Sequence, residues 1–505
     1  MNISTEPWIP IVWTNGRAGM VSLCEAFERG EGIRDLAVRP HERIALMRLL
    51  ICIAHAALDG PANKEDWKTC RSKIAPAALD YLKRWHHAFE LFGEGQRFLQ
   101  VEGLKKPTAK TDDIEGNLVS KLDLALATGN NPTLFDNGGG SERTFTPAQI
   151  ALMLLTFQCF SPGGRIGVAE WDGTPTPGNG SSDHAPCIVG SMLHALVRGD
   201  NLLETIHYNL MSKERVAEFY GTGKWGQPVW EKMPTGLLDT QTIYNATETY
   251  LGRLVPLSRC IRLADDCRSL ILANGLKYPE WREPTATIVT RKVKDQPTRV
   301  PLPASVEKAA WRELHALVVI AVDRNSNGGP AALTNVTDDA AFDLWTGGLA
   351  ANKAKLVDTT ESVFHVPATM LHEPSQRVYE DGVRWAENLA SRLAKAVSAY
   401  HRELADNLDR AELRDRRQQI QDKATAQFWT DIEQAVPQLL DIATHPVRLG
   451  NNEWHKTDWG KTVWAAARAA YEHACPHDTP RQMRAYALGL NTLHFTPKTD
   501  EETEA

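Results

Sequence analysis

Two clusters of glycine are the feature of this sequence best suited to close contact with a ligand. Residues 129–182 contain 10 of the 35 glycines in the chain, most of them in Asn137-Gly-Gly-Gly140 and Pro162-Gly-Gly-Arg-Ile-Gly167. Because glycine has no side chain, bare backbone at these loops can approach a ligand closely. One apolar helical stretch separates the clusters, so we expect the two loops to lie near each other and to contact a nucleic acid.

The motifs that bind nucleotides or activate hydrolytic nucleophiles are missing from the sequence. It contains no G-x-x-x-x-G-K-[ST] phosphate loop, H-E-x-x-H zinc helix, G-x-S-x-G elbow or G-x-G-x-x-G turn after a strand. Asp183-His184 and His372-Glu373 pair an acid with a histidine, but sequence neighbours seldom point at one another, so we interpret both as loop histidines. We therefore expect a protein that is not an enzyme.

The composition is that of a large protein with an ordinary hydrophobic core. The 505 residues are 42% hydrophobic and 24% charged, which suits two or three domains. No secretion segment is recognisable and the apolar runs are too short to cross a bilayer, so we expect a cytoplasmic protein with no membrane partner. A net charge of −7 argues against coating nucleic acid with the whole surface, although it does not exclude local basic sites.

The eight cysteines are scattered and form no C-x-x-C pair. A disulfide framework or a zinc ribbon would need paired spacing, and the closest pair, Cys260 and Cys267, stands alone. We expect most of these cysteines to be small buried apolar residues and we expect no metal or other cofactor.

The N-terminal part combines strand and helix signals. Residues 8–13 and 20–23 flank the turn pair Asn15-Gly16 and predict a hairpin. Ser22-Leu-Cys-Glu25 then predicts a capping box at the start of a short helix. From Pro40 onward, apolar residues recur at helical spacing and predict a longer helix.

Later segments continue the mixed pattern. Strands are expected at residues 270–275 and 285–290, with Arg291, Lys292 and Lys294 at a hairpin tip that faces water. Residues 305–322 keep one face apolar at helical spacing and predict a helix. The fold class expected for residues 1–367 is a mixed α/β globular domain within an α+β protein.

The C-terminal part changes to helical patterns alone. Four segments, residues 382–408, 412–442, 457–474 and 479–494, have apolar stripes at helical spacing, with Pro437 a kink in the second. Short connections favour an antiparallel four-helix bundle over residues 368–496. The acidic residues 497–505 are expected to form a disordered tail.

Four segments together resemble a known family. Glu6-Pro-Trp-Ile-Pro10, Asn131-Pro-Thr-Leu-Phe-Asp136, Phe160-Ser-Pro-Gly-Gly-Arg-Ile-Gly167 and Gly199-Asp-Asn-Leu-Leu-Glu-Thr205 are similar to the large subunit (CasA) of the type I-E Cascade CRISPR surveillance complex. Order and spacing agree along nearly the whole chain. The resemblance implies a globular domain followed by a four-helix bundle, and a role in DNA interrogation. In such systems the protein reads a short motif and RNA pairing reads the rest.

The resemblance also implies residues that read the protospacer-adjacent motif from the DNA minor groove. The glycine loop of the family matches Gly163, Gly164 and Arg165, where a side chain would obstruct the approach of the backbone. The lysine of the family matches Arg268, which keeps the charge but changes its geometry and so puts the motif preference in doubt. The alternatives are an ordinary surface turn for the glycines and a solvated strand residue for Arg268.

A third element of the family is a wedge that enters the opening duplex. Its match is Asn352, Lys353 and Ala354, shortly after Gly347-Gly348, with a lysine in place of the glutamine of the best-known members. A lysine stem can stack against a base step while its charge reaches phosphate. The alternative is a glycine-rich surface turn with a solvated lysine.

Two more elements are expected to contact other members of the complex. The loop Leu134, Phe135 and Asp136 resembles the family's anchor to the 5′ end of the guide RNA and to neighbouring subunits, with a buried Phe135 as the alternative. Arg414 and Arg417 lie in a helix of mixed charge, which is typical of a solvated surface with i,i+4 pairs. Because the family bundle guides the displaced DNA strand, these two arginines are also candidates for phosphate contacts.

The sequence therefore predicts a binding subunit with several partners. We expect it to bind the guide CRISPR RNA, target double-stranded DNA, the other Cascade subunits (backbone, guide 5′-end-binding and small) and a nuclease-helicase. One rival interpretation is a nucleic-acid hydrolase, although cleavage needs clustered carboxylates for metal ions that the sequence does not visibly supply. The other rival is a structural scaffold that touches only protein and guide RNA.

Overall fold

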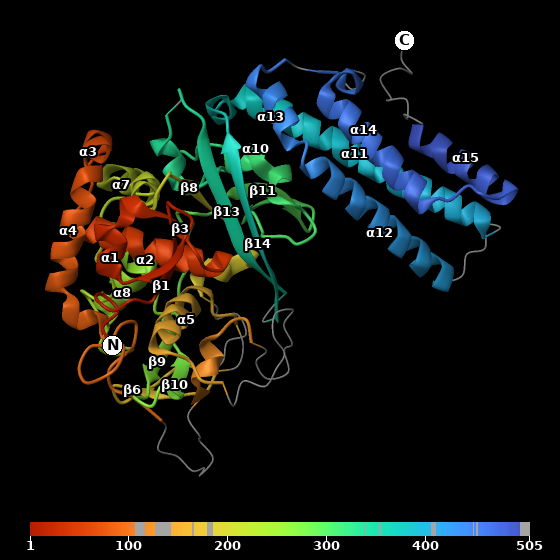
Figure 1. The fold of residues 1–505 in the computed structure, drawn as a ribbon. Coiled ribbons are helices and arrows are strands. Elements are labelled where there is room, and N and C mark those ends of the chain that lie inside the picture. The colour runs from red at the N-terminus through yellow and green to blue at the C-terminus, as the bar shows by residue number, and fades with distance from the viewer. Residues whose placement is uncertain are drawn as a thin grey trace. The chain divides into compact units, whose positions relative to one another are not determined.

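The computed structural model divides the protein into two compact units (Figure 1). Unit 1 contains Met1–Ala310 and Ala316–Val366, and unit 2 contains Trp311–His315 and Pro367–Ala505. The structure describes residues 1–106, 117–126, 143–163, 166–178, 185–337, 339–352, 355–405, 411–447, 449–450 and 453–494. No helix in this described part is both long and apolar enough to cross a lipid bilayer.

The N-terminal hairpin forms as its turn residues predict. β1 (Ile9–Trp13) pairs antiparallel with β2 (Ala18–Val21), and β3 (Ile33–Leu36) pairs with the other edge of β1. Gly16 in the turn has a φ of +80°, which glycine adopts without strain. Ser22 and Glu25 form the predicted capping box at the start of α1 (Leu23–Glu28). Both predictions for this region are confirmed.

The core of unit 1 is built around α2 (Pro40–Leu58), which begins at the predicted proline. Fifteen of its residues are buried, because α4 (Arg71–Arg84), α5 (Pro147–Phe160) and α9 (Tyr250–Leu254) pack against it. A helix that is apolar on all sides needs neighbours on all sides. The remaining helices of unit 1 are α3 (Lys64–Thr69), α6 (Leu202–Tyr208), α7 (Lys213–Tyr220) and α8 (Thr240–Glu248).

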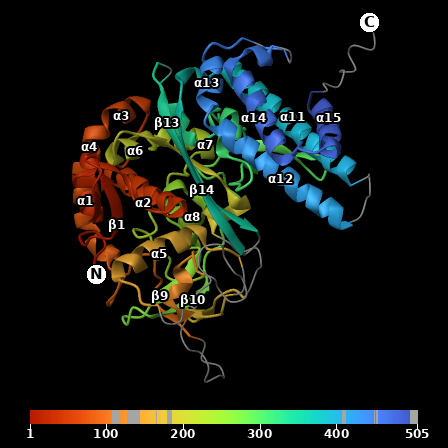
Figure 2. The ribbon, with the colours of Figure 1, turned by 45° about the vertical axis from the view of Figure 1, so that its right-hand side comes forward.

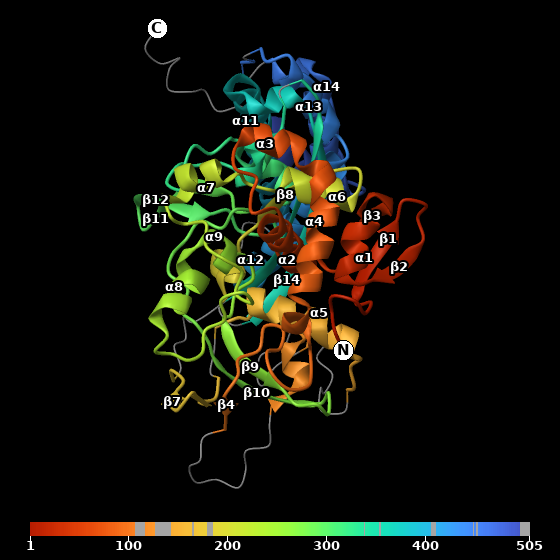
Figure 3. The same ribbon diagram turned by 90° about the vertical axis from the view of Figure 1, so that its left-hand side faces the viewer.

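Small antiparallel sheets surround this helical core. The predicted strands near residues 270 and 290 are present as β10 (Ser269–Asn274) and β11 (Ile288–Val293), although residues 285–287 lie before the second strand. β10 pairs with β9 (Arg259–Leu263) and β5 (Asn117–Leu118), and β11 pairs with β12 (Gln296–Pro301). Figure 3 shows β9 and β10 side by side and the β11–β12 ribbon at the edge of the unit. A further sheet contains β4 (Leu104–Lys105), β6 (Glu170–Trp171) and β7 (Thr174–Pro175).

The longest strands form a hairpin at the end of unit 1. β13 (Phe342–Asn352) pairs antiparallel with β14 (Lys355–Val366) along its whole length, and β8 (His194–Arg198) pairs with the other edge of β13. Gly347 and Gly348 lie inside β13. These two glycines are therefore strand residues, whereas the solvated lysine of the alternative prediction lies outside the described residues. Their role is close packing, because a Cβ on Gly348 would lie 2.8 Å from the Met192 carbonyl oxygen.

The helix predicted over residues 305–322 is wrong in length. Only a 3-10 turn at Ala310–Glu313 and the four-residue α10 (Leu314–Leu317) form there. The apolar face that suggested one helix serves two cores, because Trp311–His315 belongs to unit 2 while the residues from Ala316 onward belong to unit 1. A single straight helix would keep both sets of side chains on one face.

Unit 2 is helical throughout its described part, and its long helices lie alongside one another (Figure 2). α11 packs against α12, α14 and α15, and α12 also packs against α14. The apolar stripe of α11 and the one that spans α12 and α13 are buried as predicted. The bounds are α11 (Glu373–Leu404), α12 (Ala411–Glu433), α13 (Val436–Thr444), α14 (Asp458–Ala474) and α15 (Pro480–His494).

Two predicted helix bounds in unit 2 need correction. α11 begins at Glu373 instead of residue 382, with Pro374 in its first turn. Gly382 is an interior position, because a Cβ there would lie 2.4 Å from Leu439. The segment predicted as one helix over residues 412–442 is two helices, since Pro437 stands in the first turn of α13. Proline removes a backbone donor, so it tolerates a first turn better than an interior.

Candidate nucleic-acid interface

The stem of the second glycine loop is firmly held. After α5 ends at Phe160, the Ser161 carbonyl oxygen accepts from the Ala185 backbone N–H at 2.9 Å, and the Pro162 carbonyl oxygen accepts from Arg259 Nη2 at 2.9 Å. Arg259 is buried, so this bond is shielded from water. Gly163 follows as a half-buried bend. The backbone of Gly163 is thus presented from a fixed stem.

Arg268 lies at a tight turn between β9 and β10. Asp266 accepts the backbone N–H groups of Arg268 and Ser269 at 2.8 and 3.0 Å, and these bonds lower the pKa of Asp266 below its ordinary value. Cys267 has a left-handed φ of +57°, which closes the turn. The Arg268 backbone oxygen accepts from the Val119 N–H at 2.8 Å, while its side chain is exposed. The turn therefore fixes the backbone of Arg268 and leaves the guanidinium in solvent.

Gly163 and Arg268 are associated with opposite ends of the β9–β10 hairpin. The stem of the glycine loop is bonded to Arg259, which pairs with Asn274, whereas Arg268 precedes Ser269 at the other end of β10. Six residues of strand span about 17 Å at about 3.3 Å per residue. This length equals about five base-pair steps of 3.4 Å. This separation is within the reach of a single duplex.

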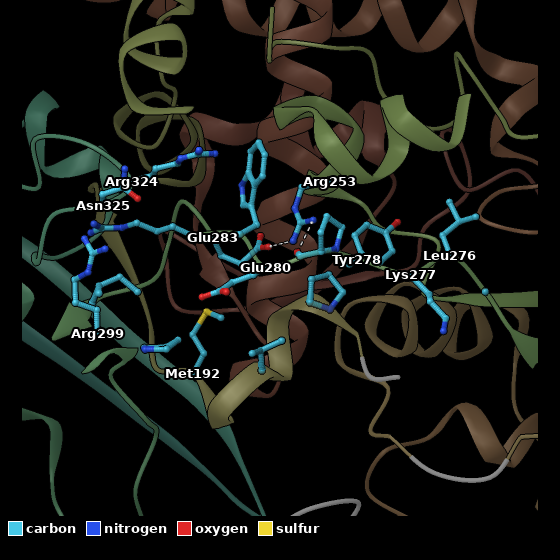
Figure 4. A pocket seen from close by; sticks show the side chains of 18 of the residues that line it. Met192, Arg253, Leu276, Lys277, Tyr278, Glu280, Glu283, Arg299, Arg324 and Asn325 are labelled. Atoms are coloured by element: carbon cyan, nitrogen blue, oxygen red, sulfur yellow. Dashed lines mark hydrogen bonds and ion pairs between the residues drawn. The ribbon is translucent and has the colours of Figure 1, made fainter. Parts of the chain in front are cut away.

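A basic groove of about 920 Å³ opens at the Asn274 end of the same hairpin (Figure 4). Figure 4 shows Arg299 and Arg324 at one end of the groove and Lys277 toward the other, with Glu280 between them. These four side chains are exposed. The cations that line the groove are Arg253, Arg259, Lys277, Arg282, Arg299 and Arg324, and the acids are Glu280 and Glu283.

The floor of the groove is held by a buried ion triad. Glu283 lies between Arg48 and Arg253, with a distance of 2.8 Å between the carboxylate and each guanidinium. Burial by itself would raise the pKa of Glu283, but the two arginines outweigh it and hold that pKa below its ordinary value. All three side chains are at most 3% exposed. Removing one member would leave an uncompensated buried charge, which typically costs about 3 to 5 kcal/mol.

Arg282 is a structural cation and not a solvent-facing one. Its guanidinium donates to the backbone carbonyl oxygens of Ser326, Gly328 and Gly329 at 2.6 to 2.9 Å. Burial lowers its pKa to about 10. Arg282 therefore fastens residues 323–329 to the groove. Of the arginines that line the groove, Arg299 and Arg324 are the ones that remain exposed and can meet a ligand.

The β11–β12 ribbon supplies one wall of the groove. Arg299 pairs directly with Thr290, and residues that pair across an antiparallel ladder share a face. Alternation along β11 brings Lys292 to the same face two residues later. Lys294 and Asp295 form the tip of the ribbon with positive φ. The predicted charged hairpin tip is confirmed for Lys294, whereas Arg291 and Lys292 lie within β11 and carry the charge along the strand.

Of the predicted wedge residues, Asn352 is described by its backbone alone. Asn352 is the last residue of β13 and pairs with Lys355, the first residue of β14. Near this end, the Ser191 hydroxyl donates to the Ala351 carbonyl oxygen and accepts from the Ala351 N–H, both at 2.9 Å. The predicted wedge residues Lys353 and Ala354 lie outside the described residues, as does the Asn352 side chain.

Several other predicted site residues also lie outside the described part of the chain. These are Gly164 and Arg165 of the second glycine loop and Leu134, Phe135 and Asp136 of the anchor loop. The chain enters α5 after Thr146 and leaves it after Phe160. A helix of 14 residues is about 21 Å long at 1.5 Å per residue, so the described stems of the two glycine loops emerge from opposite ends of α5.

Arg414 and Arg417 are on α12 in unit 2. Arg414 is exposed and Arg417 is half-buried. Three residues apart on a helix, they are neighbours on its surface. Both have interactions with other groups of the protein. They belong to unit 2, whereas Gly163 belongs to unit 1.

The described residues offer little metal or redox chemistry. Within this part of the chain, no group of three or more His, Cys, Asp or Glu side chains is arranged to hold a metal ion. Each of the eight cysteines is a free thiol in this structure. Six are buried, and burial raises the pKa of Cys260 to about 12, which suppresses the reactive thiolate.

Reasoning from sequence missed most of the basic groove. Arg259, Arg299 and Arg324 are 40 and 25 residues apart in sequence, and no short motif joins them. The sequence indicated only the basic residues near the tip of the β11–β12 ribbon, and these were interpreted as a hairpin tip that faces water. Long-range packing of the segments, and not their local pattern, builds this site.

Comparison with known proteins gives a consistent result. A family model described as CRISPR-associated protein Cse1 matches residues 2–470. A CRISPR-associated protein CasA/Cse1 of Thermus thermophilus is 30% identical over 432 residues, which are 78% of either chain. Among solved structures, Thermus thermophilus CasA has a TM-score of 0.73 at 22% identity and covers 98% of both chains. Cse1 from Acidimicrobium ferrooxidans has a TM-score of 0.73 at 20% identity, over 98% of this chain and 96% of that one.

A further solved structure is titled CRISPR RNA-guided surveillance complex. One of its chains matches 98% of this chain and 99% of its own length, with a TM-score of 0.69 at 18% identity. At this identity the likeness concerns the fold. The same fold therefore recurs in a chain of an assembled complex.

Proposed function

This chain belongs to the CRISPR-associated Cse1 family, the large subunits of type I-E Cascade, and from that premise we propose that it reads the protospacer-adjacent motif in duplex DNA. It does so without enzyme activity, as a binding subunit of an RNA-guided surveillance complex. The basic groove beside the fixed stem of the glycine loop is the observation that supports this proposal. Clustered cations next to exposed backbone suit a phosphate backbone and its minor groove.

The motif is read by backbone and charge together. Gly163 and Gly164 bring bare backbone to the minor groove, and Arg165 and Arg268 add cations. The minor groove distinguishes A·T from G·C pairs but little else, so a short and partly degenerate motif is expected. Because Arg268 is associated with the far end of the β9–β10 hairpin, the duplex runs along this hairpin during reading.

The tip between β13 and β14 then opens the duplex. Asn352, Lys353 and Ala354 enter between the strands, with the lysine stem against a base step and its charge toward phosphate. Unstacking a step costs a few kcal/mol, on the order of what these contacts and the first RNA–DNA pairs return. The bond between Ser191 and Ala351 stiffens the base of this tip.

Other surfaces connect the subunit with its partners. The Leu134-Phe135-Asp136 loop anchors it to the 5′ end of the guide RNA and to neighbouring Cascade subunits, through stacking or insertion of Phe135. Unit 2, as a four-helix bundle, guides the displaced strand past Arg414 and Arg417. Once the target is open, the subunit recruits the nuclease-helicase that degrades it.

The decisive experiment changes the motif-reading residues within the assembled complex. Complexes with Arg268→Ala or Lys353→Ala are compared with the unmodified chain for binding to targets that differ only in the adjacent motif. We expect Arg268→Ala to weaken binding and relax motif preference, and Lys353→Ala to slow duplex opening. Lys68→Ala removes another exposed cation, which lies on α3 and not on the β9–β10 hairpin, and serves as the control.

Each rival interpretation has its own outcome. If neither variant changes affinity or motif preference, the subunit is a scaffold that touches only protein and guide RNA. If the purified chain cuts labelled DNA catalytically with Mg²⁺ present, it is a hydrolase. Intact DNA together with an altered motif preference supports the proposed reading role.

A further inference from the structure

One short segment that lies more than 50 residues before the C-terminal helices in sequence packs among them. Trp311–His315 belongs to unit 2, while its neighbours Ala310 and Ala316 on either side belong to unit 1. The chain therefore passes between the units three times, at 310/311, at 315/316 and at 366/367. Two of these passages exist only because of this segment, which we call the strap.

The strap is anchored by a buried tryptophan. Trp311 is 2% exposed, and its ring centroid lies 5.9 Å from that of Trp429 on α12 and 6.0 Å from that of Trp459 on α14. Tilted and edge-on arrangements at such distances are favourable for aromatic pairs. The Tyr379 hydroxyl of α11 donates to the Trp311 carbonyl oxygen at 2.8 Å. Three separate helices thus contact Trp311: α12 and α14 contact its ring, and α11 contacts its backbone.

The next residue adds a charge-specific contact. The Arg312 guanidinium lies 3.8 Å from the ring centroid of Trp429, and its Nη2 atom lies 2.6 Å from a carboxylate oxygen of Glu387. The Arg312 side chain is 13% exposed, so both contacts are poorly screened by water. Tryptophan and arginine in desolvated pockets are the residues that dominate binding energy at protein interfaces.

We propose that the strap is an intramolecular ligand within unit 2 that keeps residues 1–366 associated with residues 367–505 independently of the covalent link at Val366–Pro367. Trp311 and Arg312 are the residues of the strap that bind. Their receptor is the surface formed by Tyr379, Glu387, Trp429 and Trp459. This inference concerns how the chain stays together and does not depend on the proposed DNA reading. The contacts of the strap are non-covalent, so they can hold the two parts of the chain together even after the peptide link between residues 366 and 367 is cut.

The test uses the full chain with a site-specific protease sequence inserted between Val366 and Pro367. After complete cutting under native conditions, size-exclusion chromatography over a dilution series reports whether residues 1–366 and 367–505 remain associated. We expect co-elution for the chain with the natural strap. Trp311→Ala is expected to raise the concentration needed for association by about 100-fold, and Arg312→Ala by about 10-fold. Arg384→Ala, an exposed arginine elsewhere on α11, is the control and leaves association unchanged.

Two results of the association experiment would overturn the proposal. One is separation of the two pieces of the cut chain while the natural strap is present. The other is association of the Trp311→Ala pieces as tight as that of the control. Circular dichroism of the 367–505 piece released from the Trp311→Ala chain shows whether Trp311 is a ligand of already folded helices or a part of the core that these helices need in order to fold. Retained helicity supports a preformed receptor, whereas loss of helicity makes Trp311 part of the core and also contradicts the proposal.

Discussion

A buried histidine with no partner makes this protein sensitive to acid. His41 at the start of α2 is 2% exposed, and in the described structure neither of its ring nitrogens has a hydrogen-bond partner. Burial, with a smaller contribution from Arg39, lowers the pKa of His41 to about 3. Because the unfolded chain binds this proton near pH 6.5, stability is complete above that pH and decreases as the pH falls toward 3. The loss from His41 is about 3 kcal/mol at pH 4.

Replacing this side chain should flatten the pH profile. His41→Phe removes the titrating group and keeps a ring against Phe160, whose centroid lies 6.0 Å away. We expect unchanged or higher stability at pH 7 and a smaller decrease of the urea midpoint between pH 6.5 and 4. His473→Phe, at an exposed position on α14, is the control and keeps the full decrease. Equal pH profiles for the two variants would contradict the assignment to His41.

The sequence predicts the structural roles of some residues well and of others not at all. Gly16 and the Ser22–Glu25 capping box follow from local chemistry alone, and the structure has both. Arg259 had no such signal, although its bond to Pro162 fixes the stem of the glycine loop. That bond joins residues 97 apart in sequence, so only tertiary packing creates it. Local rules therefore predict turns and caps, but not the side chains that hold the glycine loop in place.

At the scale of elements, the β13–β14 hairpin depends on a glycine in mid-strand. A Cβ on Gly348 would lie 2.8 Å from the Met192 carbonyl oxygen and 2.8 Å from the Ala304 side chain. Gly348→Ala is therefore expected to lower the free energy of unfolding by about 1 to 3 kcal/mol, as overpacking does. Gly167→Ala is the matched control, since a Cβ there meets no atom within 4 Å. Equal urea midpoints for the two variants would contradict this prediction, because they would show that β13 can make room for the Cβ without losing stability.

Element prediction failed where one apolar stripe served two neighbours. Residues 305–322 have the periodicity of one helix, yet Trp311 packs with Trp429 and Trp459 while Leu317 and Val318 are buried in unit 1. Periodicity reports that side chains are buried but not which core buries them. By contrast, the stripes of α11 and α14 face one core each, and those helices were predicted to within a few residues at their C-terminal ends.

At the scale of the whole molecule, a net charge of −7 coexists with a locally basic groove. The excess negative charge repels nucleic acid from most of the surface, so attraction is confined to places such as the wall with Arg299 and Arg324. This distribution favours one docking orientation over general coating. It also means that few phosphate contacts carry the salt dependence of binding.

That salt dependence tests the groove directly. Each phosphate contact to duplex DNA contributes about 0.9 to the slope of log affinity against log salt. In the assembled complex, the double variant Arg299→Ala and Arg324→Ala should therefore reduce the slope by about 2 between roughly 50 and 200 mM salt, while motif preference stays the same. Lys64→Ala with Lys68→Ala removes the same charge from α3, outside the groove, and should leave the slope unchanged. If both double variants have the same slope, the groove does not contact the DNA backbone, and the duplex is held by the hairpin and the wedge alone.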